Sequence, residues 1–312
     1  MEIMKYSIVI PVFKSAQNLP DLFTALTQLS IRLEQQLEVV FVVDGSPDNS
    51  AKILYDELPG FIFPTQIIEL SRNFGSFQAI RVGVEESIGE TVAVCSADLQ
   101  EPLELIVTLF HTVESGKSDI ALGTRRSRND GWMNNFSSGL FWKIYRRFVM
   151  PDMPHGGVDV FACNQTFKFH LLSMKETRTS LIAQIFWLGF KREFIQYDRV
   201  KRSIGKSSWS RRKKIDYMLD SIFSFTDLPI RLVTLTGAVG SILSVVIGIL
   251  IAVLRIMGYI AVPGYTPTLL AVLFLGAINL LAIGIIGSYI WRTFENSKGR
   301  PLSVIARRIS KD

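Results

Sequence analysis

Two aspartates of this chain stand just after apolar, β-branched segments, where a carboxylate can do chemistry. Asp44 follows residues 38–43, and Asp98 comes shortly after residues 91–95. One such carboxylate can accept hydrogen bonds from the N–H of uracil and from ribose hydroxyls. Another can hold Mg²⁺ or Mn²⁺, which prefer hard oxygen ligands and leave coordination positions open for phosphate oxygens. The pair indicates a site for a nucleoside diphosphate whose departure a cation assists, unless both carboxylates only cap loops.

The segments around these aspartates alternate between strand and helix patterns. Strands are predicted at residues 6–12, 38–43, 65–70, 91–95 and 119–123, with helices from about 18 to 35 and at 50–58, 77–87 and 104–115. This alternation predicts an α/β fold with a mostly parallel sheet and helices on both faces. Ligands of such sheets bind beyond the carboxyl ends of the strands, where both aspartates fall. Neither Gly-x-Gly-x-x-Gly nor Gly-Lys-Ser/Thr occurs, which disfavours dinucleotide oxidoreductases and P-loop ATPases.

Composition points to a membrane rather than to a nucleic acid. The chain has 312 residues, a formal net charge of +6 and a mean hydropathy of +0.28. Its basic residues gather beside hydrophobic segments, which favours anionic lipid or phosphate as the partner. Cys95 and Cys163 have no Cys-x-x-Cys spacing, so we expect free thiols in a reducing compartment. The first residues lack a signal-peptide layout, so we expect a cytosolic N-terminal domain.

Two uncharged segments, residues 232–254 and 268–291, are each long enough to cross about 30 Å of hydrocarbon. Glycines and prolines between them favour a helical hairpin, and the alternative is a pair of buried core helices. Cationic residues flank only the outer ends of this hairpin, apart from Arg255. They are Lys206, Arg211, Arg212, Lys213, Lys214 and Arg231 before it, and Arg292, Lys298, Arg300, Arg307, Arg308 and Lys311 after it. The bias places both termini in the cytoplasm.

Two further segments have the composition of helices that lie in the lipid headgroup plane. Residues 211–228 and 136–149 carry aromatic and aliphatic side chains at helical spacing, with arginines and lysines among them. The alternative is that each is an ordinary helix that faces a protein core. Glycines within the two apolar segments allow close helix approach, inside the hairpin or between subunits, so a homo-oligomer is one expectation.

Several short motifs occur in an order typical of one enzyme family. They are residues 10–13 (IPVF), 43–48 (VDGSPD), 70–75 (LSRNFG), 97–102 (ADLQEP), 202–207 (RSIGKS), 223–229 (FSFTDLP) and 299–302 (GRPL). Together they resemble the GT-A glycosyltransferases of family 2, and more narrowly the polyprenyl-phosphate sugar transferases, such as bactoprenol glucosyltransferases and dolichol-phosphate mannose synthases. The resemblance covers nearly the whole chain.

The resemblance implies a domain order and a set of site residues. It implies a Rossmann-like GT-A catalytic domain (1–210), an amphipathic juxtamembrane helix (211–231), a two-helix transmembrane hairpin (232–291) and a basic cytoplasmic tail (292–312). Pro11 and Asp44 would line the base and ribose pocket, and Asp98 and Gln100 would hold the metal and the diphosphate. Arg125 would face the phosphates, and Asp159 would lie near the reacting centre. Arg202 and Lys206 would close over the phosphates.

The implied activity is inverting transfer of a sugar from a UDP-sugar to the phosphate of a polyprenyl phosphate. Glucose and N-acetylglucosamine are the favoured sugars, Mg²⁺ or Mn²⁺ is the implied cofactor, and the enzyme would be a multi-pass protein of the plasma (inner) membrane. Asp159 is the candidate orienting or base-like carboxylate, and the alternative is a structural carboxylate paired with an arginine. His155, in a nearby loop, is either incidental or directly involved.

The chain departs from the family pattern at positions that matter for the metal. Ser96 stands where the family has the first aspartate of Asp-Ala-Asp, and Val43 stands where it has the first of Asp-Asp-Gly-Ser. These changes motivate an alternative function, a catalytically degenerate glycosyltransferase that serves as a membrane scaffold or partner subunit. A processive polysaccharide synthase would need a Gln-x-x-Arg-Trp motif and a longer membrane channel, and the sequence has neither.

Overall fold

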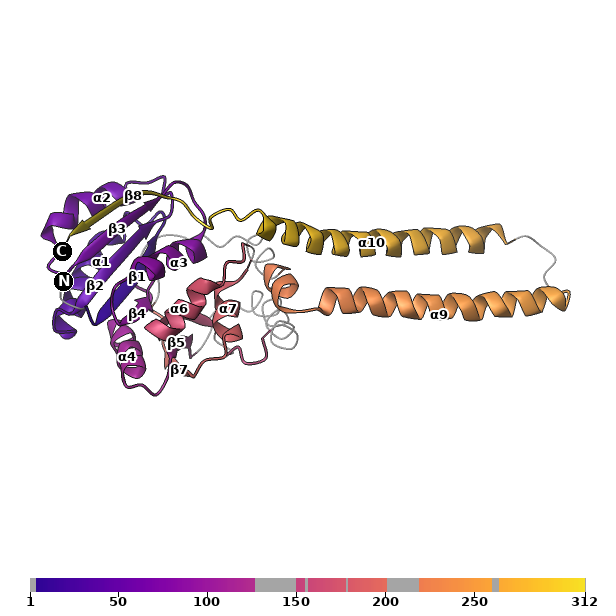
Figure 1. The fold of residues 1–312 in the computed structure, drawn as a ribbon, viewed down its shortest axis with the longest axis horizontal. Helices are drawn as coiled ribbons and strands as arrows, with labels where there is room; N and C mark the ends of the chain where they lie inside the picture. Colours follow the sequence, from indigo (N-terminus) through magenta and orange to yellow (C-terminus); the bar gives the residue numbers. More distant parts are fainter. Residues whose placement is uncertain are drawn as a thin grey trace. The chain divides into compact units, whose positions relative to one another are not determined.

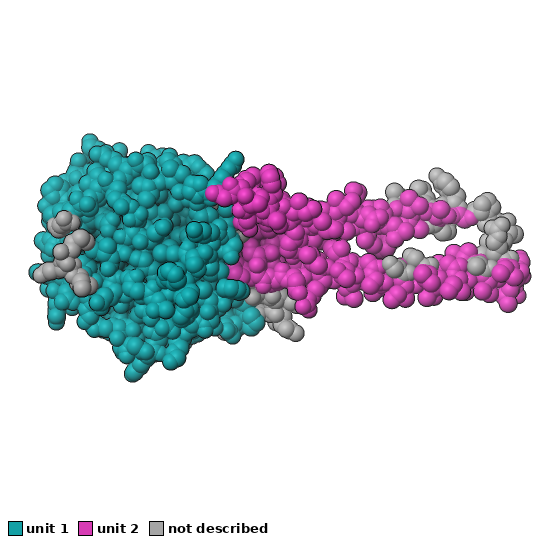
Figure 2. Space-filling model, in the orientation of Figure 1, with its two compact units in different colours: residues 1–214, 300–312 teal, residues 215–299 magenta. Residues whose placement is uncertain are grey.

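The computed structural model describes residues 4–126, 150–154, 157–177, 179–200, 219–259 and 264–311. The chain forms two compact units (Figure 2). One comprises Met1–Lys214 together with Arg300–Asp312, and the other comprises Ile215–Gly299. Of the predicted site residues, Arg202 and Lys206 lie outside the described residues. The structure also does not describe His155, residues 136–149 or the first part of the segment 211–228.

The first unit contains an eight-stranded sheet with the order β7-β5-β6-β4-β1-β2-β3-β8 (Figure 1). The strands are β1 (Tyr6–Val12), β2 (Leu37–Val43), β3 (Thr65–Leu70), β4 (Thr91–Val94), β5 (Ile120–Arg125), β6 (Val158–Asn164), β7 (Arg192–Tyr197) and β8 (Ile305–Lys311). The four central strands, β4, β1, β2 and β3, are parallel, and so are β5 and β7. β6 runs antiparallel to both β4 and β5. The predicted α/β fold with a mostly parallel sheet is confirmed.

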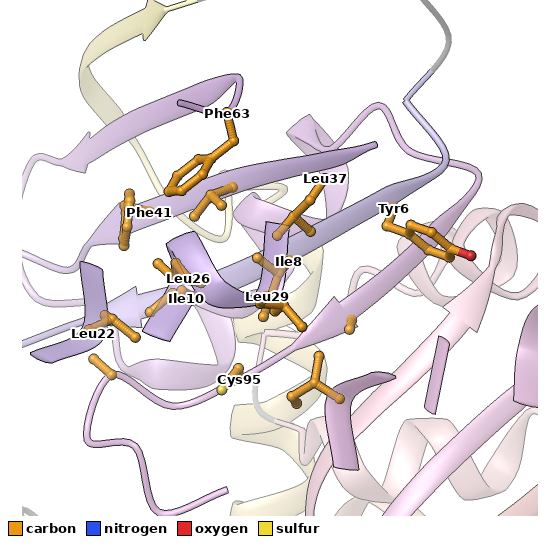
Figure 3. Packing of buried hydrophobic residues seen from close by; sticks show 14 of the residues in the cluster. Tyr6, Ile8, Ile10, Leu22, Leu26, Leu29, Leu37, Phe41, Phe63 and Cys95 are labelled. Atoms are coloured by element: carbon orange, nitrogen blue, oxygen red, sulfur yellow. The ribbon is translucent and has the colours of Figure 1, made fainter. Parts of the chain in front are cut away.

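Helices lie between the strands and cover both faces of the sheet. They are α1 (Leu19–Arg32), α2 (Ser50–Glu57), the 3₁₀ turn η1 (Leu58–Gly60), α3 (Ser76–Glu86), α4 (Leu103–Glu114), α6 (Gln165–Ser173) and α7 (Leu181–Trp187). Every residue of β2 is buried, which is why its sequence is a continuous apolar run apart from Glu38. Ile8, Ile10 and Phe41 pack with the leucines of α1 on one face (Figure 3). On the other face α3 approaches closely at Gly83, where a Cβ would lie 2.2 Å from Val9 Cγ1.

The C-terminal residues form an edge strand, which the sequence analysis treated only as part of a basic tail. β8 pairs antiparallel with β3 over most of its length. Its basic side chains contact the same unit: Arg308 pairs with Glu86, and the guanidinium of Arg307 lies 4.8 Å from the ring centre of Tyr55. Lys311 Nζ donates to the carbonyl oxygens of Pro59, at 2.8 Å, and of Phe61. Residues 305–311 are therefore a structural part of the first unit.

Deletion of residues 305–312 is expected to destabilise the first unit, because it exposes the edge of β3 and removes the Lys311 and Arg308 contacts. We expect a loss of about 2–3 kcal/mol, which corresponds to a melting temperature lower by roughly 5–10 °C. Thermal unfolding of the full chain in detergent measures the effect, and removal of Asp312 alone is the control. An unchanged melting temperature would mean that β8 contributes nothing to stability.

The second unit contains two long apolar helices, α9 (Leu228–Ile256) and α10 (Tyr265–Ser297). Within them, Leu228–Ile251 and Phe274–Ser297 are long and apolar enough to cross a membrane, and none of either span is buried in the structure. If the two spans were core helices of a protein interior, most of their residues would be buried. Residues 219–225 form a short helix against the end of α10, where Arg292 pairs with Asp220 at 2.8 Å and lies over the ring of Phe223. The prediction of two C-terminal apolar helices is confirmed.

Candidate active site

The predicted site residues that the structure describes gather at one edge of the sheet. Asp44 follows the end of β2, Asp98 follows β4, and Arg125 is the last residue of β5. Asp159 is the second residue of β6, and it reaches the same edge because an antiparallel strand begins where its parallel neighbours end. Pro11 lies near the end of β1, beyond the last residue paired with β4, so its missing N–H breaks no bond of that ladder.

Asp44 organises the neighbouring loop that leads into α3. Its buried carboxylate accepts hydrogen bonds from the backbone N–H groups of Phe74, at 2.7 Å, and Gly75, at 2.9 Å. Its carbonyl oxygen accepts from Asn73 Nδ2 at 3.1 Å. These contacts are those of a loop-capping carboxylate. The predicted contact of Asp44 with a base or ribose stays a prediction.

Gly45 lets the loop after β2 pack directly against the loop at residues 72–75. It has φ +54°, and a Cβ there would lie 2.4 Å from both Arg72 C and Asn73 N. The guanidinium of Arg72 lies 4.0 Å from the ring centre of Phe74 in the same loop. No side chain fits between two backbones at this distance, so the position requires glycine.

Replacement of Gly45 with alanine is expected to push the two loops apart and to strain the backbone. We expect a destabilisation of about 1–3 kcal/mol and a weaker affinity for UDP, the nucleotide that the family resemblance implies, because the Asp44 loop moves with residues 72–75. Thermal unfolding and calorimetric titration with UDP measure the two effects. Gly60→Ala is the matched control, since a Cβ at Gly60 meets nothing within 4 Å. Equal behaviour of the two variants would contradict the prediction.

Ser96 joins two carboxylates after β4. Its hydroxyl lies 2.7 Å from Asp98 Oδ1, and it also makes a hydrogen bond with Glu101 Oε2. Glu101 is only 4% exposed. Burial raises the pKa of Glu101, the hydrogen bond from Ser96 opposes this, and the negative charges of Asp98 and Asp159 add to the increase. Glu101 is not among the site residues predicted from the sequence, where the only signal for it is its place as the acid within residues 97–102.

Gln100 fixes the segment that follows β7. Its backbone oxygen accepts from Val200 N at 3.0 Å, and its side-chain Nε2 donates to Val200 O at 3.2 Å. Its side-chain Oε1 accepts from the guanidinium of Arg199, a residue that the sequence analysis did not single out. This segment leads directly to residues 201–218, which contain Arg202 and Lys206. Gln100 thus connects the loop that contains Asp98 to Arg199 and Val200, directly before the segment that contains Arg202 and Lys206.

Arg125 and Asp159 form a two-pronged ion pair. Arg125 Nη2 donates to Asp159 Oδ1 at 2.7 Å, and Nε donates to Oδ2. The hydroxyl of Tyr197 on β7 also donates to Asp159 Oδ2, at 2.8 Å. Burial and the charge of Asp159 raise the pKa of Tyr197 far above its usual value, so the phenol keeps its proton and donates. Three neighbouring strands therefore hold this carboxylate in place.

Comparison with known proteins decides the family. A model of glycosyl transferase family 2 matches residues 7–173. An uncharacterized glycosyltransferase of Synechocystis sp. is 33% identical over 97% of this chain and 95% of its own length. The chain belongs to glycosyl transferase family 2. This family 2 enzyme is also 28% identical to the prophage bactoprenol glucosyl transferase homolog of Escherichia coli K12, over 97% of this chain and 99% of that protein.

Two further proteins are similar to this chain. The bactoprenol glucosyl transferase of Shigella phage SfX is 28% identical over 98% of this family 2 glycosyltransferase and 100% of its own length. A crystal structure of S. aureus TarS 1–349 in complex with UDP-GlcNAc is 15% identical, with a TM-score of 0.47 over 72% of this chain and 68% of that chain. The family assignment rests on the sequence matches.

GT-A glycosyltransferases commonly use a divalent metal, and the donor set after β4 suits one. Asp98 and Glu101 offer carboxylate oxygens, and Gln100 and Ser96 offer neutral oxygens. The described residues contain no group of three or more His, Cys, Asp or Glu that could hold a metal ion. Mg²⁺ is often bound by only one or two carboxylates together with substrate phosphates, so this sparse set of hard ligands fits it.

Proposed function

We propose that this glycosyltransferase transfers a sugar, with inversion, from a UDP-sugar to the phosphate of a polyprenyl phosphate. One observation carries the proposal. Relatives named for bactoprenol glucosyl transfer match 97% and 98% of this chain, so the similarity includes both the catalytic unit and the apolar helices. An enzyme with a nucleotide site and two apolar helices suits one water-soluble and one lipid substrate. The relatives' names favour glucose as the sugar, with N-acetylglucosamine next.

The reaction forms one bond and breaks one. A phosphate oxygen of the acceptor attacks the anomeric carbon from the side opposite UDP, and the bond between that carbon and the UDP oxygen breaks. The acceptor phosphate is already ionised near neutral pH, so the enzyme's main tasks are placement and stabilisation of the departing charge. Asp159, held by Arg125 and Tyr197, is the proposed orienting carboxylate.

The remaining predicted residues act on the donor. Pro11 and Asp44 line the proposed nucleotide site, and Arg202 and Lys206 are proposed to close over the phosphates. Asp98 and Gln100 would hold Mg²⁺ or Mn²⁺, which when bound neutralises charge on the diphosphate. Gln100 Oε1 accepts from Arg199 in this structure, so metal binding would require Arg199 to release that oxygen.

We further propose that the two helices cross the plasma membrane as a hairpin, with the catalytic unit and both termini in the cytoplasm. β8 supports this topology, because a strand that follows α10 pairs with a strand that precedes α9. A chain that leaves a domain and returns to its sheet crosses a membrane an even number of times. A cysteine at Met257 should react with an impermeant maleimide added to intact cells, and a cysteine at Ser310 should not. The reverse pattern would contradict the topology.

A transfer assay tests the proposed function. Purified protein in detergent is mixed with undecaprenyl phosphate, Mg²⁺ or Mn²⁺, and one radiolabelled nucleotide sugar at a time, and the lipid is then extracted into organic solvent. We expect label in the lipid phase with UDP-glucose or UDP-N-acetylglucosamine. Absence of transfer with every donor, while UDP still binds, would favour the degenerate scaffold that Ser96 and Val43 motivate.

A further inference from the structure

The loop after β4 contains a carboxylate next to the position where the family pattern loses one. Ser96 stands in place of the first aspartate of the family motif, yet its hydroxyl makes a hydrogen bond with Glu101 Oε2. The same hydroxyl is 2.7 Å from Asp98 Oδ1. Two carboxylates from one loop, those of Asp98 and Glu101, therefore meet at the Ser96 side chain.

Glu101 is a buried acidic residue. It is nine-tenths or more buried and forms no ion pair in the part of the chain that the structure describes, and the one positive charge that acts on it there is that of Arg199. A buried carboxylate is normally paired with a cation or coordinates a metal, because an uncompensated buried charge is costly. The neighbouring Arg199 donates to Gln100 Oε1 rather than to Glu101.

The Ser96 hydroxyl lies between the two carboxylates. A hydroxyl has one proton, so it donates to one carboxylate oxygen at a time and leaves the other close to a lone pair. A divalent cation near Asp98 and Glu101 would be attracted by both negative charges. The oxygens of Asp98, Glu101 and Gln100 are hard ligands, which suit Mg²⁺ and Mn²⁺. The buried thiol of Cys95 also lies beside Glu101, with its Sγ 3.9 Å from Oε2.

We propose that Glu101 supplies the second carboxylate of the metal site, in place of the aspartate that Ser96 has replaced. This inference rests on the proposed function, since it assigns a ligand for the metal of the same site. The site would then comprise the carboxylates of Asp98 and Glu101, with the amide oxygen of Gln100 and the phosphates of the donor completing the shell. The departure at Ser96 is therefore a relocation of the carboxylate and not a loss of the metal.

Binding of Mn²⁺ to the full chain in detergent tests this inference without reference to turnover. The free aqueous ion gives a sharp paramagnetic resonance signal that decreases on binding, and titrations are run with Mn²⁺ alone and with Mn²⁺ plus UDP. We expect Glu101→Gln to weaken binding by about tenfold or more. We expect the double variant Ser96→Asp, Glu101→Gln to recover most of that loss, because it returns a carboxylate to the family position.

Glu104→Gln is the matched control. Glu104 is close in sequence, but it is exposed and pairs with Arg32 at 2.8 Å. Unfolding temperatures of all variants are recorded, and Glu101→Asp, which keeps the charge on a shorter stem, serves if Glu101→Gln does not fold. The Mn²⁺ affinity of Glu101→Asp should be weaker than that of the wild type and of Glu104→Gln, but Mn²⁺ should still bind.

Wild-type affinity in a folded Glu101 variant, or an equal loss in Glu104→Gln, would overturn the inference. So would a wild-type protein that binds no Mn²⁺ but still transfers sugar, and in that case the proposed function would stand. A wild-type protein that binds Mn²⁺ through Glu101 but transfers no sugar to any lipid would support the inference and contradict the proposed function. The two proposals therefore fail in different experiments.

Discussion

Replacing Asp98 with asparagine is expected to lower sugar transfer by about a thousandfold or more. The substitution keeps the shape of the side chain and its place beside Ser96 Oγ, 2.7 Å away, but it removes a negative charge from the proposed metal site. Without that charge the diphosphate departs with less neutralisation, and loss of one such stabilising group typically costs about 10²–10³-fold before any loss of metal. The initial rate of lipid labelling at saturating UDP-sugar measures the effect.

The control for this variant is Asp56→Asn, which removes the same charge from an exposed position on α2. Transfer by the control should equal that of the wild type. An Asp98→Asn protein that is folded and transfers sugar within about threefold of the wild-type rate would contradict the site assignment, since a stabilising group of this kind is expected to contribute at least about 10²-fold.

Replacing Asp159 with asparagine is expected to lower kcat by about a hundredfold or more. Asp159 is the carboxylate on which Arg125 and Tyr197 converge, and an amide cannot accept both prongs of the guanidinium. If Asp159 orients the acceptor or assists as a base, its loss acts on the reacting centre, where such groups contribute typically about 10²–10⁴-fold. Steady-state kinetics over a range of pH, with both substrates varied, measures the change.

A double-mutant cycle separates this role from simple pairing with arginine. Asp159→Asn is measured again in an Arg125→Gln background. We expect most of the loss in kcat to persist there, because the carboxylate acts on the substrate. Disappearance of the loss would mean that Asp159 serves only to hold Arg125. Tyr197→Phe is the matched control, since it removes one hydrogen bond to Asp159 and should cost less than about tenfold.

The local sequence by itself determined the central strands, the position of Asp44 and the two apolar helices. Mostly apolar runs such as residues 38–43 predict buried parallel strands. Asp44 is found in the same way, because it is the carboxylate directly after that run. The two long uncharged segments predict α9 and α10 in the same way. These features depend on neighbours along the chain, so a pattern in one sequence is enough to find them.

Only the tertiary structure decided which distant residues meet. The β8 residues are largely exposed and basic and resemble a tail, and their strand exists because β3 offers an open edge far away in the sequence, as in the Lys311–Phe61 contact 250 positions apart. Asp159 meets Arg125, 34 positions away, because β6 runs antiparallel. Gln100 meets Arg199 across 99 positions, because each follows a strand, β4 or β7, and these two strands run in the same direction. Such contacts arise from strand order and direction, which no local pattern of residues specifies.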